Sequence, residues 1–80
     1  MLTYALRLAY RYDGMVLATV PDVPEAMAVG RDDEEACEQA LRALESALDD
    51  YVAQGRPFPP ARTAGTVTVT TVKFEMLTPA

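Results

Sequence analysis

Residues 4–12 alternate between two sets of side chains, as expected for a β-strand with one buried face. We expect the heavier and more apolar set to face the core; it comprises Tyr4, Leu6, Leu8, Tyr10 and Tyr12. Asp13-Gly14 follows directly, and residues 15–20 form a second apolar run. An Asp-Gly pair between two such runs predicts a hairpin with a two-residue type I′ turn, whose central residues need positive φ angles.

A two-residue turn at Asp13-Gly14 also decides which side chains share the second face of the hairpin. It places Tyr10 opposite Leu17 on the core face and leaves on the other face Ala5, Arg7, Ala9, Arg11, Val16, Ala18 and Val20. Because this second face is rather apolar for contact with water, we expect a partner or a second copy to bind it. The contact candidates are Arg7, Arg11, Val16 and Val20. The alternative is an exposed antiparallel face partly screened by the arginine stems.

The segment after the hairpin predicts a turn and a third strand. Pro21 and Pro24 end the second strand, because proline cannot donate to a strand ladder. Residues 26–29 then form a short apolar run before Gly30. We interpret this run as the third strand of a small antiparallel sheet.

A long amphipathic helix is predicted for residues 33–54. Its apolar positions lie on an arc of about 160° and are residues 36, 37, 40, 41, 44, 47, 48, 51 and 52. Asp32 and Glu35 have the spacing of a capping box, in which each side chain accepts a backbone hydrogen bond from the other residue. Gly55 supplies the left-handed residue that ends many helices, and the prolines that follow, Pro57, Pro59 and Pro60, prevent the helix from resuming.

Residues 66–76 predict a last strand whose apolar positions change parity, from Val67 and Val69 to Val72, Phe74 and Met76. We therefore expect a bulge or a change of partner near Thr70-Thr71. The predicted order is β-β-β-α-β. The fold class is α+β, with a small antiparallel β-sheet and one long helix on one face.

Length and charge restrict the classes of function. Eighty residues suffice for one domain, residues 1–80, and we expect no separate DNA-binding domain. Twelve acidic and seven basic residues give a net charge of −5, which disfavours nucleic acid and favours a basic partner. A core this small also favours a homo-oligomer, a dimer or a tetramer.

Residue types also bear on cofactors and location. Histidine is absent and Cys37 is the sole cysteine, so we expect no metal, no cofactor and a cytoplasmic protein. No run approaches the roughly 18 apolar residues of a membrane span, and the first residues do not have the pattern of an export signal. We expect no membrane association.

The predicted helix carries most of the acidic residues. Eight of the twelve lie within residues 32–54, together with a single base, Arg42. On the face opposite the apolar arc, the candidate partner contacts are Glu34, Glu38, Glu45 and Asp49. A solvated outer face explains these residues adequately. A docking surface for a basic partner explains in addition why Asp49 and Asp50 stand near the negative end of the helix dipole.

Several short motifs, in their order and spacing, resemble the HicB antitoxin family over residues 4–60. They are an acidic-Gly turn, a Pro-Asp-hydrophobic-Pro strand end, a glycine before a capped helix that begins with Glu-Glu-Ala, and a Gly-x-Pro-x-Pro exit. The positions are Asp13, Gly14, Pro21, Asp22, Pro24, Gly30, Asp32, Glu35, Ala36, Gly55, Pro57 and Pro59. The resemblance implies a partial ribonuclease H-like fold without enzymatic activity. It also implies an antitoxin that binds and neutralises a small basic mRNA-cleaving toxin of the HicA type.

The chain departs from that family's pattern at three places. Glu25 stands where the family commonly has glycine, and Ala26 where many members have cysteine. Family antitoxins usually continue into a helix-turn-helix or ribbon-helix-helix segment, and this sequence stops at Ala80. We therefore expect no specific binding of duplex DNA by this chain alone.

Two other interpretations fit parts of the sequence. Asp13 and Asp22 could belong to a metal-dependent nuclease site, although turn positions already explain both residues. Cys37 lies near the helix start, where a thiolate could be stabilised, although a small buried apolar residue is the simpler explanation. The main alternative to an antitoxin is an orphan HicB-like structural or ligand-sensing domain that only self-associates.

Overall fold

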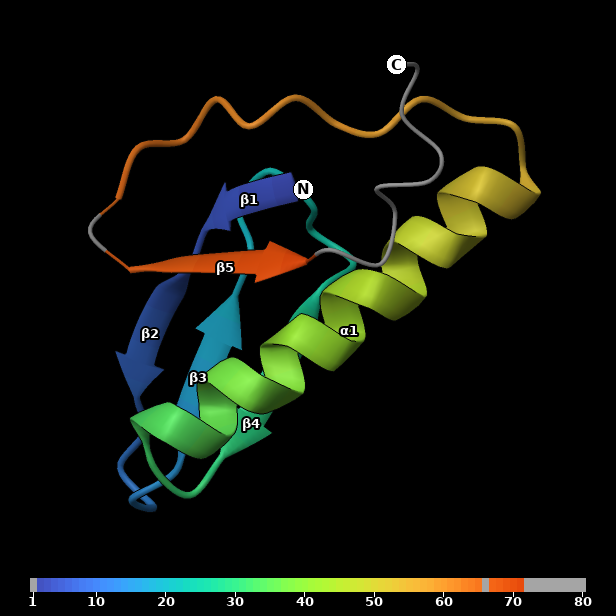
Figure 1. The fold of residues 1–80 in the computed structure, drawn as a ribbon. Helices are drawn as coiled ribbons and strands as arrows, with labels where there is room; N and C mark the ends of the chain where they lie inside the picture. Colours follow the sequence, from blue (N-terminus) through green and yellow to red (C-terminus); the bar gives the residue numbers. More distant parts are fainter. Residues whose placement is uncertain (1, 66, 72–80) are drawn as a thin grey trace.

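The computed structural model describes residues 2–65 and 67–71, which form an α+β arrangement of short antiparallel strands and a long helix (Figure 1). In chain order the elements are β1 (Leu2–Ala5), β2 (Arg7–Tyr10), β3 (Val16–Thr19), β4 (Met27–Gly30), α1 (Asp33–Ala53) and β5 (Thr68–Thr71). Strands β2, β3 and β4 form a three-stranded sheet, and β1 pairs with β5 in a two-stranded sheet. The predicted fold class is confirmed.

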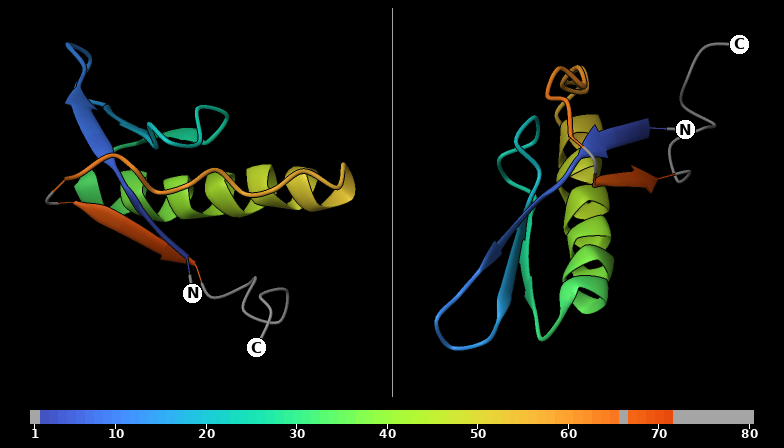
Figure 2. Two further views of the ribbon diagram at one scale, coloured as in Figure 1. Left: turned by 90° about the horizontal axis from the view of Figure 1, so that it is seen from above. Right: turned by 90° about the vertical axis from the view of Figure 1, so that its left-hand side faces the viewer.

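The predicted first strand is in fact two strands, separated by Leu6. Tyr4, Ala5 and Leu6 are all at most 5% exposed, so the alternation of buried and exposed positions stops there. β1 and β2 leave Leu6 at an angle and pair with different neighbours (Figures 1 and 2). The observed order in the described residues is therefore β-β-β-β-α-β.

The hairpin between β2 and β3 has a three-residue loop, so the predicted register is wrong by one position. The Arg11 N–H donates to the Met15 carbonyl at 2.9 Å, and the Gly14 N–H donates to the Arg11 carbonyl at 3.1 Å. Gly14 has a φ of 85°, and no other residue of the described hairpin has a positive φ. The turn is therefore type I followed by a left-handed glycine, and Tyr10 lies opposite Val16.

A shift of one residue exchanges the two faces of a strand. Val16 and Val20, predicted on an exposed face, are 4% and 0% exposed and belong to the core. Tyr10 and Tyr12, predicted in the core, are 71% and 103% exposed. The two valines are misplaced because Asp-Gly fits both loop lengths, and alternation cannot distinguish between them. Tyr10 stays on the same side of its strand as Leu8, but this strand lies at the edge of the sheet, and Tyr12 lies in the hairpin loop.

Helix α1 covers one face of the three-stranded sheet, with β5 beside it (Figure 2). Its buried positions are Ala36, Ala40, Leu44, Ala47, Leu48 and Tyr51, all on the predicted apolar arc. Near the helix start the sheet approaches very closely: a Cβ on Gly30 would lie 2.3 Å from the Ala36 nitrogen. This contact explains why a glycine precedes the helix.

The start of α1 is capped nearly as predicted. The Asp32 carboxylate accepts a hydrogen bond from the Glu35 N–H at 2.8 Å. The Glu35 carboxylate reaches back one residue further than a capping box requires and accepts from the Arg31 N–H at 3.2 Å. It also pairs with the Arg31 guanidinium at 3.1 Å. Asp32 thus satisfies a backbone N–H that the helix leaves without a partner, and Glu35 satisfies the N–H of the residue just before the cap.

The end of α1 is a Schellman motif. Gly55 has a φ of 68°, and its N–H donates to the Val52 carbonyl at 3.1 Å. The Arg56 N–H donates to the Tyr51 carbonyl at 2.8 Å, which completes the pair of bonds that defines the motif. The Arg56 guanidinium also lies 4.3 Å from the centre of the Tyr51 ring. The predicted role of Gly55 as helix terminator is confirmed.

Asp22 holds the segment that returns from the helix, residues 56–65, along the molecule (Figure 1). One carboxylate oxygen accepts from the N–H groups of Arg62 and Thr63 at 3.0 and 2.9 Å. The other accepts from the Thr63 hydroxyl at 2.9 Å. We call these three bonds the Asp22 clasp. The Tyr4 hydroxyl adds a fourth bond to this segment, donating to the Pro59 carbonyl at 2.7 Å.

The Asp22 clasp predicts an acid-sensitive part of the stability. The hydrogen bond from the Thr63 backbone N–H, with those from the Thr63 hydroxyl and the Arg62 N–H, holds the pKa of Asp22 below its usual value. A lowered folded-state pKa contributes stability above the unfolded-state value, and that contribution is lost as pH falls through the folded-state value. We expect Asp22→Asn to lower the melting temperature at pH 7 and to flatten its decline below pH 4, as circular dichroism can measure. Asp50→Asn, at an exposed helix position, is the control and should match the wild type at pH 7.

Buried and exposed side chains alternate regularly along the whole of β5. It pairs regularly with β1, so that Val69 lies opposite Tyr4 and Thr71 opposite Leu2. Val69 and Thr71 are 7% and 2% exposed. No bulge occurs in β5 up to Thr71, and the predicted change to Val72, Phe74 and Met76 lies outside the described residues.

Candidate functional site

The predicted acidic face of α1 is only partly free for a partner. Glu34, Glu38 and Asp49 are exposed. Glu45 is half-buried and accepts a hydrogen bond from the Thr71 hydroxyl of β5 at 2.5 Å. The expectation that Glu45 faces away from the core is wrong, because β5 packs on this side of the helix.

The first turn of α1 concentrates negative charge. It contains Asp33, Glu34 and Glu35, where the helix dipole stabilises carboxylates. Glu35 is engaged with Arg31, whose side-chain and backbone hydrogen bonds lower the pKa of Glu35. Glu34 is exposed and Glu38 follows one turn later on the same side. These two carboxylates form the exposed acidic surface at the helix start.

The face of the three-stranded sheet that is turned away from α1 is also open (Figure 2). We call it the outer sheet face; its strand positions are Arg7, Ala9, Leu17, Thr19, Met27 and Val29. Met27 is 56% and Val29 38% exposed, and Leu17 is partly buried. An apolar sheet surface therefore exists as predicted, but the register shift builds it from Leu17 in place of Val16 and Val20. One feature of the sequence indicated the observed register: Val16 and Val20 are β-branched, and such residues favour buried strand positions.

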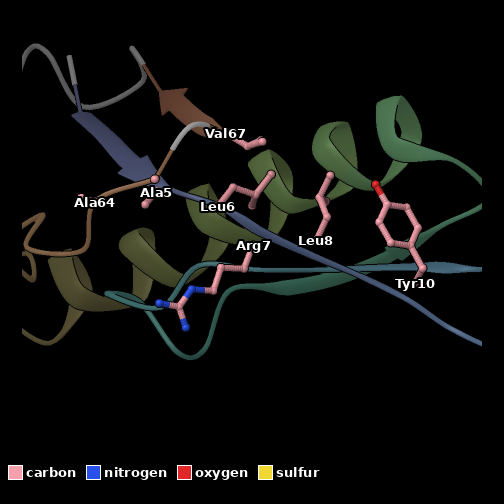
Figure 3. Close-up of a pocket in the computed structure, with 8 residues that line it drawn as sticks. Ala5, Leu6, Arg7, Leu8, Tyr10, Ala64 and Val67 are labelled. Carbon is pink, nitrogen blue, oxygen red and sulfur yellow. The ribbon is translucent and has the colours of Figure 1, made fainter.

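A cavity of about 400 Å³ opens beside β2, where the pairing of β1 with β5 ends (Figure 3). The last bond of that pairing runs from the Leu6 N–H to the Val67 carbonyl at 2.9 Å. Beyond it residues 64–65 leave the strand, and among the described residues no backbone bond joins them to Leu8 or Tyr10. The cavity is lined by Ala5, Leu6, Arg7, Leu8, Tyr10, Ala64, Gly65 and Val67. We call the edge of β2 from Leu8 to Tyr10, which borders this cavity, the open edge.

Tyr10 connects the open edge to the acidic start of the helix. Its hydroxyl donates to an Asp33 carboxylate oxygen at 3.1 Å, and this hydrogen bond raises the pKa of Tyr10. No local pattern predicts this contact, because it joins residues 23 positions apart. The open edge is therefore flanked by negative charge.

The carboxylates and the thiol considered for catalysis have structural partners. Asp13 accepts from the Met15 N–H at 3.0 Å and pairs with Arg11 at 3.0 Å. Asp22 uses both oxygens in its clasp. Burial raises the pKa of Cys37, which disfavours a thiolate there. Residues 2–65 and 67–71 contain no group of three or more cysteine or carboxylate side chains able to hold a metal ion.

A family model described as the HicB_like antitoxin of a bacterial toxin-antitoxin system matches residues 3–78. The chain belongs to this HicB-like antitoxin family. The crystal structure of the N-terminal domain of the Burkholderia pseudomallei antitoxin HicB is similar to it in fold. That match has a TM-score of 0.62 at 17% identity and covers 98% of this chain and 84% of that chain. No curated protein matches the chain.

Several motif residues of this HicB-like chain support the fold. Gly30 allows the close approach of Ala36, and Asp32 caps the start of the helix. Gly55 ends the helix, and Asp22 holds the return segment by hydrogen bonds. Membership of an antitoxin family suggests a non-catalytic role. Within the described residues, no helix has the length and apolar character needed to cross a membrane.

Proposed function

We propose that this HicB-like chain neutralises a small, basic, mRNA-cleaving toxin of the HicA type by binding it directly. The observation that carries the proposal is the match to an antitoxin family over residues 3–78. The net charge of −5 and the exposed Glu34 and Glu38 support a basic partner. A toxin that cleaves RNA needs a positively charged surface to hold phosphates, and an acidic protein can cover that surface without any chemistry.

Reversing the acidic surface is expected to slow toxin binding. In the double variant Glu34→Lys/Glu38→Lys, we expect the association rate at low salt to fall about tenfold and its salt dependence to flatten, because exposed charges act mainly on encounter. The measurement is stopped-flow or biolayer interferometry with a purified small basic RNA-cleaving protein of the HicA type. Inhibition of that protein's RNA cleavage, titrated to one equivalent, tests neutralisation itself.

The matched control is Glu34→Gln/Glu38→Gln, which removes the charge without reversing it and should give an intermediate rate. Both variants should keep the wild-type circular dichroism spectrum, because the two side chains are exposed. An unchanged rate and salt dependence in a folded reversal variant would contradict a toxin contact on α1 and would direct attention to the outer sheet face. Full RNA cleavage in the presence of excess chain would contradict neutralisation.

The outer sheet face favours a second candidate function, a domain that self-associates. Exposed Met27 and Val29 beside Leu17 form an apolar surface that two copies could bury together. We expect sedimentation at micromolar concentration to show a species heavier than the 8.7 kDa chain. Met27→Asp should restore the monomer without unfolding, since Met27 is 56% exposed. A wild-type monomer throughout this range would remove the candidate.

A further inference from the structure

We propose that the open edge of β2 is a strand-addition site, which binds an extended segment of a partner protein that carries a basic residue and, two positions along, an apolar residue. The inference rests on the proposed function in one respect, the choice of a basic protein as partner. The backbone, the cavity and the charge beside it define the site in this chain alone.

Among the residues that the structure describes, none bonds to the outward backbone groups of Leu8 and Tyr10 along this edge of β2. The Arg11 N–H bonds to Met15 on the β3 side, and bonding directions alternate along an antiparallel strand. The N–H and C=O groups of Leu8 and Tyr10 therefore point away from β3. The Leu6 N–H points to the same side, where it donates to the Val67 carbonyl. An incoming strand would continue this ladder exactly where the chain's own strand leaves it.

The side chains at the open edge form an apolar floor on one side. Leu6, Leu8 and Tyr10 point to the same side of β2, and Arg7 points to the other (Figure 3). An added antiparallel strand would set alternate residues opposite Tyr10 and Leu8 and would end where Val67 already pairs with Leu6. The cavity of about 400 Å³ provides the space for these side chains. The partner segment therefore needs an apolar residue opposite Leu8.

The charged side chains beside the open edge determine which other residues fit in the partner segment. Asp33 is hydrogen-bonded to Tyr10 at one end, and Glu34 follows in the same acidic turn. A lysine or arginine opposite Tyr10 would be attracted to this turn. On the other side of the strand Arg7 favours a neutral or acidic residue. The pattern that fits is basic opposite Tyr10 and apolar opposite Leu8.

A second copy of the chain fits the same edge poorly. Antiparallel pairing of two β2 strands through Leu8 and Tyr10 would set Arg7 of each copy opposite Arg11 of the other, and like charges directly opposite are destabilising. Pairing Leu8 with itself would instead require Leu6, whose N–H is already bonded to Val67. Either arrangement would also bring two acidic helix starts together. A basic partner avoids all three conflicts.

The test is an NMR titration of the ¹⁵N-labelled chain with a synthetic peptide, acetyl-Lys-Thr-Val-Thr-Val-Thr-amide. We expect shifts and slowed hydrogen exchange at the amides of Leu8 and Tyr10, with the Ala9 amide, bonded to β3, little changed. Peptides with glutamate in place of lysine, or with proline in place of the first valine, should bind at least about tenfold more weakly. The peptide is not a toxin, so this result and the toxin assay can fail independently.

A pair of variants at Tyr10 separates the backbone from the side chain. Tyr10→Pro removes the outward N–H without removing a bond to β3, and proline is tolerated on edge strands. Tyr10→Val keeps the N–H and removes the hydroxyl bond to Asp33. We expect the proline variant to lose most of the peptide binding and the valine variant to retain most of it, with both chains folded by circular dichroism.

Four outcomes would overturn the proposal. They are equal binding of the lysine and glutamate peptides, peptide shifts confined to the outer sheet face, equal loss of binding in the two Tyr10 variants, and slow exchange of the Leu8 and Tyr10 amides in the free chain. The last result, together with a dimer in sedimentation, would assign the edge to a second copy. Protection in a monomer would assign it to this chain's own return segment.

Discussion

Replacing Gly30 by alanine is expected to destabilise the fold by about 3 kcal/mol or more. The added Cβ would lie 2.3 Å from the Ala36 nitrogen and 2.8 Å from the Ala36 Cα, where only backbone atoms could move. Overpacking at a rigid contact typically costs 1 to 3 kcal/mol, and here α1 would have to lift from β4. A chain of this size has a total stability of roughly 4 to 12 kcal/mol, so much of it would be lost.

Urea denaturation followed by circular dichroism measures this effect, and Gly65→Ala is the matched control. A Cβ on Gly65 would meet the Ala5 side chain at 3.4 Å, an ordinary contact distance. We expect the control to be neutral or slightly stabilising, because alanine restricts the unfolded chain more than glycine does. Equal midpoints for Gly30→Ala and wild type would show that α1 and β4 are not held as closely as described.

Truncating Leu44 to alanine is expected to cost about 2 to 5 kcal/mol. Leu44 is fully buried in the middle of α1 and belongs to the main hydrophobic core. Alanine favours the helix slightly more than leucine does, so the loss reports packing and not helix propensity. The urea midpoint should fall while the slope of the transition stays constant.

Val52→Ala is the control for this truncation, on the same helix at a position that is 45% exposed. We expect its stability to remain within about 0.5 kcal/mol of wild type, as for most surface substitutions. If the two variants lost similar stability, the core would not be centred on this side of α1. If Leu44→Ala changed nothing, the packing of the helix on the sheet would contribute less than its burial indicates.

The elements that the sequence predicted well depend on local rules. The helix, its Asp32 cap and its Gly55 end follow from side chains that act within four residues of one another. The acidic start of α1 follows from the positions of Asp33, Glu34 and Glu35 in the sequence. The HicB-like family was also recognisable, because its motifs lie at these local turns and caps. The ribonuclease H-like part of that resemblance stays a prediction.

The faces of the hairpin could not be predicted in the same way. Asp13-Gly14 fits both a two-residue and a three-residue loop, and the choice inverts every side chain of β3. The three-residue loop is favoured in the folded chain because it directs Val16 and Val20 toward α1. Burial of those side chains is a tertiary energy, and no local preference contains it.

The sequence by itself therefore determined the helix, its ends, the fold class, the family and the acidic character of the helix, since each depends on neighbouring residues or on composition. Only the tertiary structure decided which acidic and apolar side chains are exposed and which strand has an open edge. Leu6 separates two strands that pair in different sheets. The hydrogen bonds from Thr71 to Glu45 and from Tyr10 to Asp33 each join segments that are distant in the sequence. Such contacts depend on how sheets and helix pack against one another, and this packing leaves β2 with an open edge.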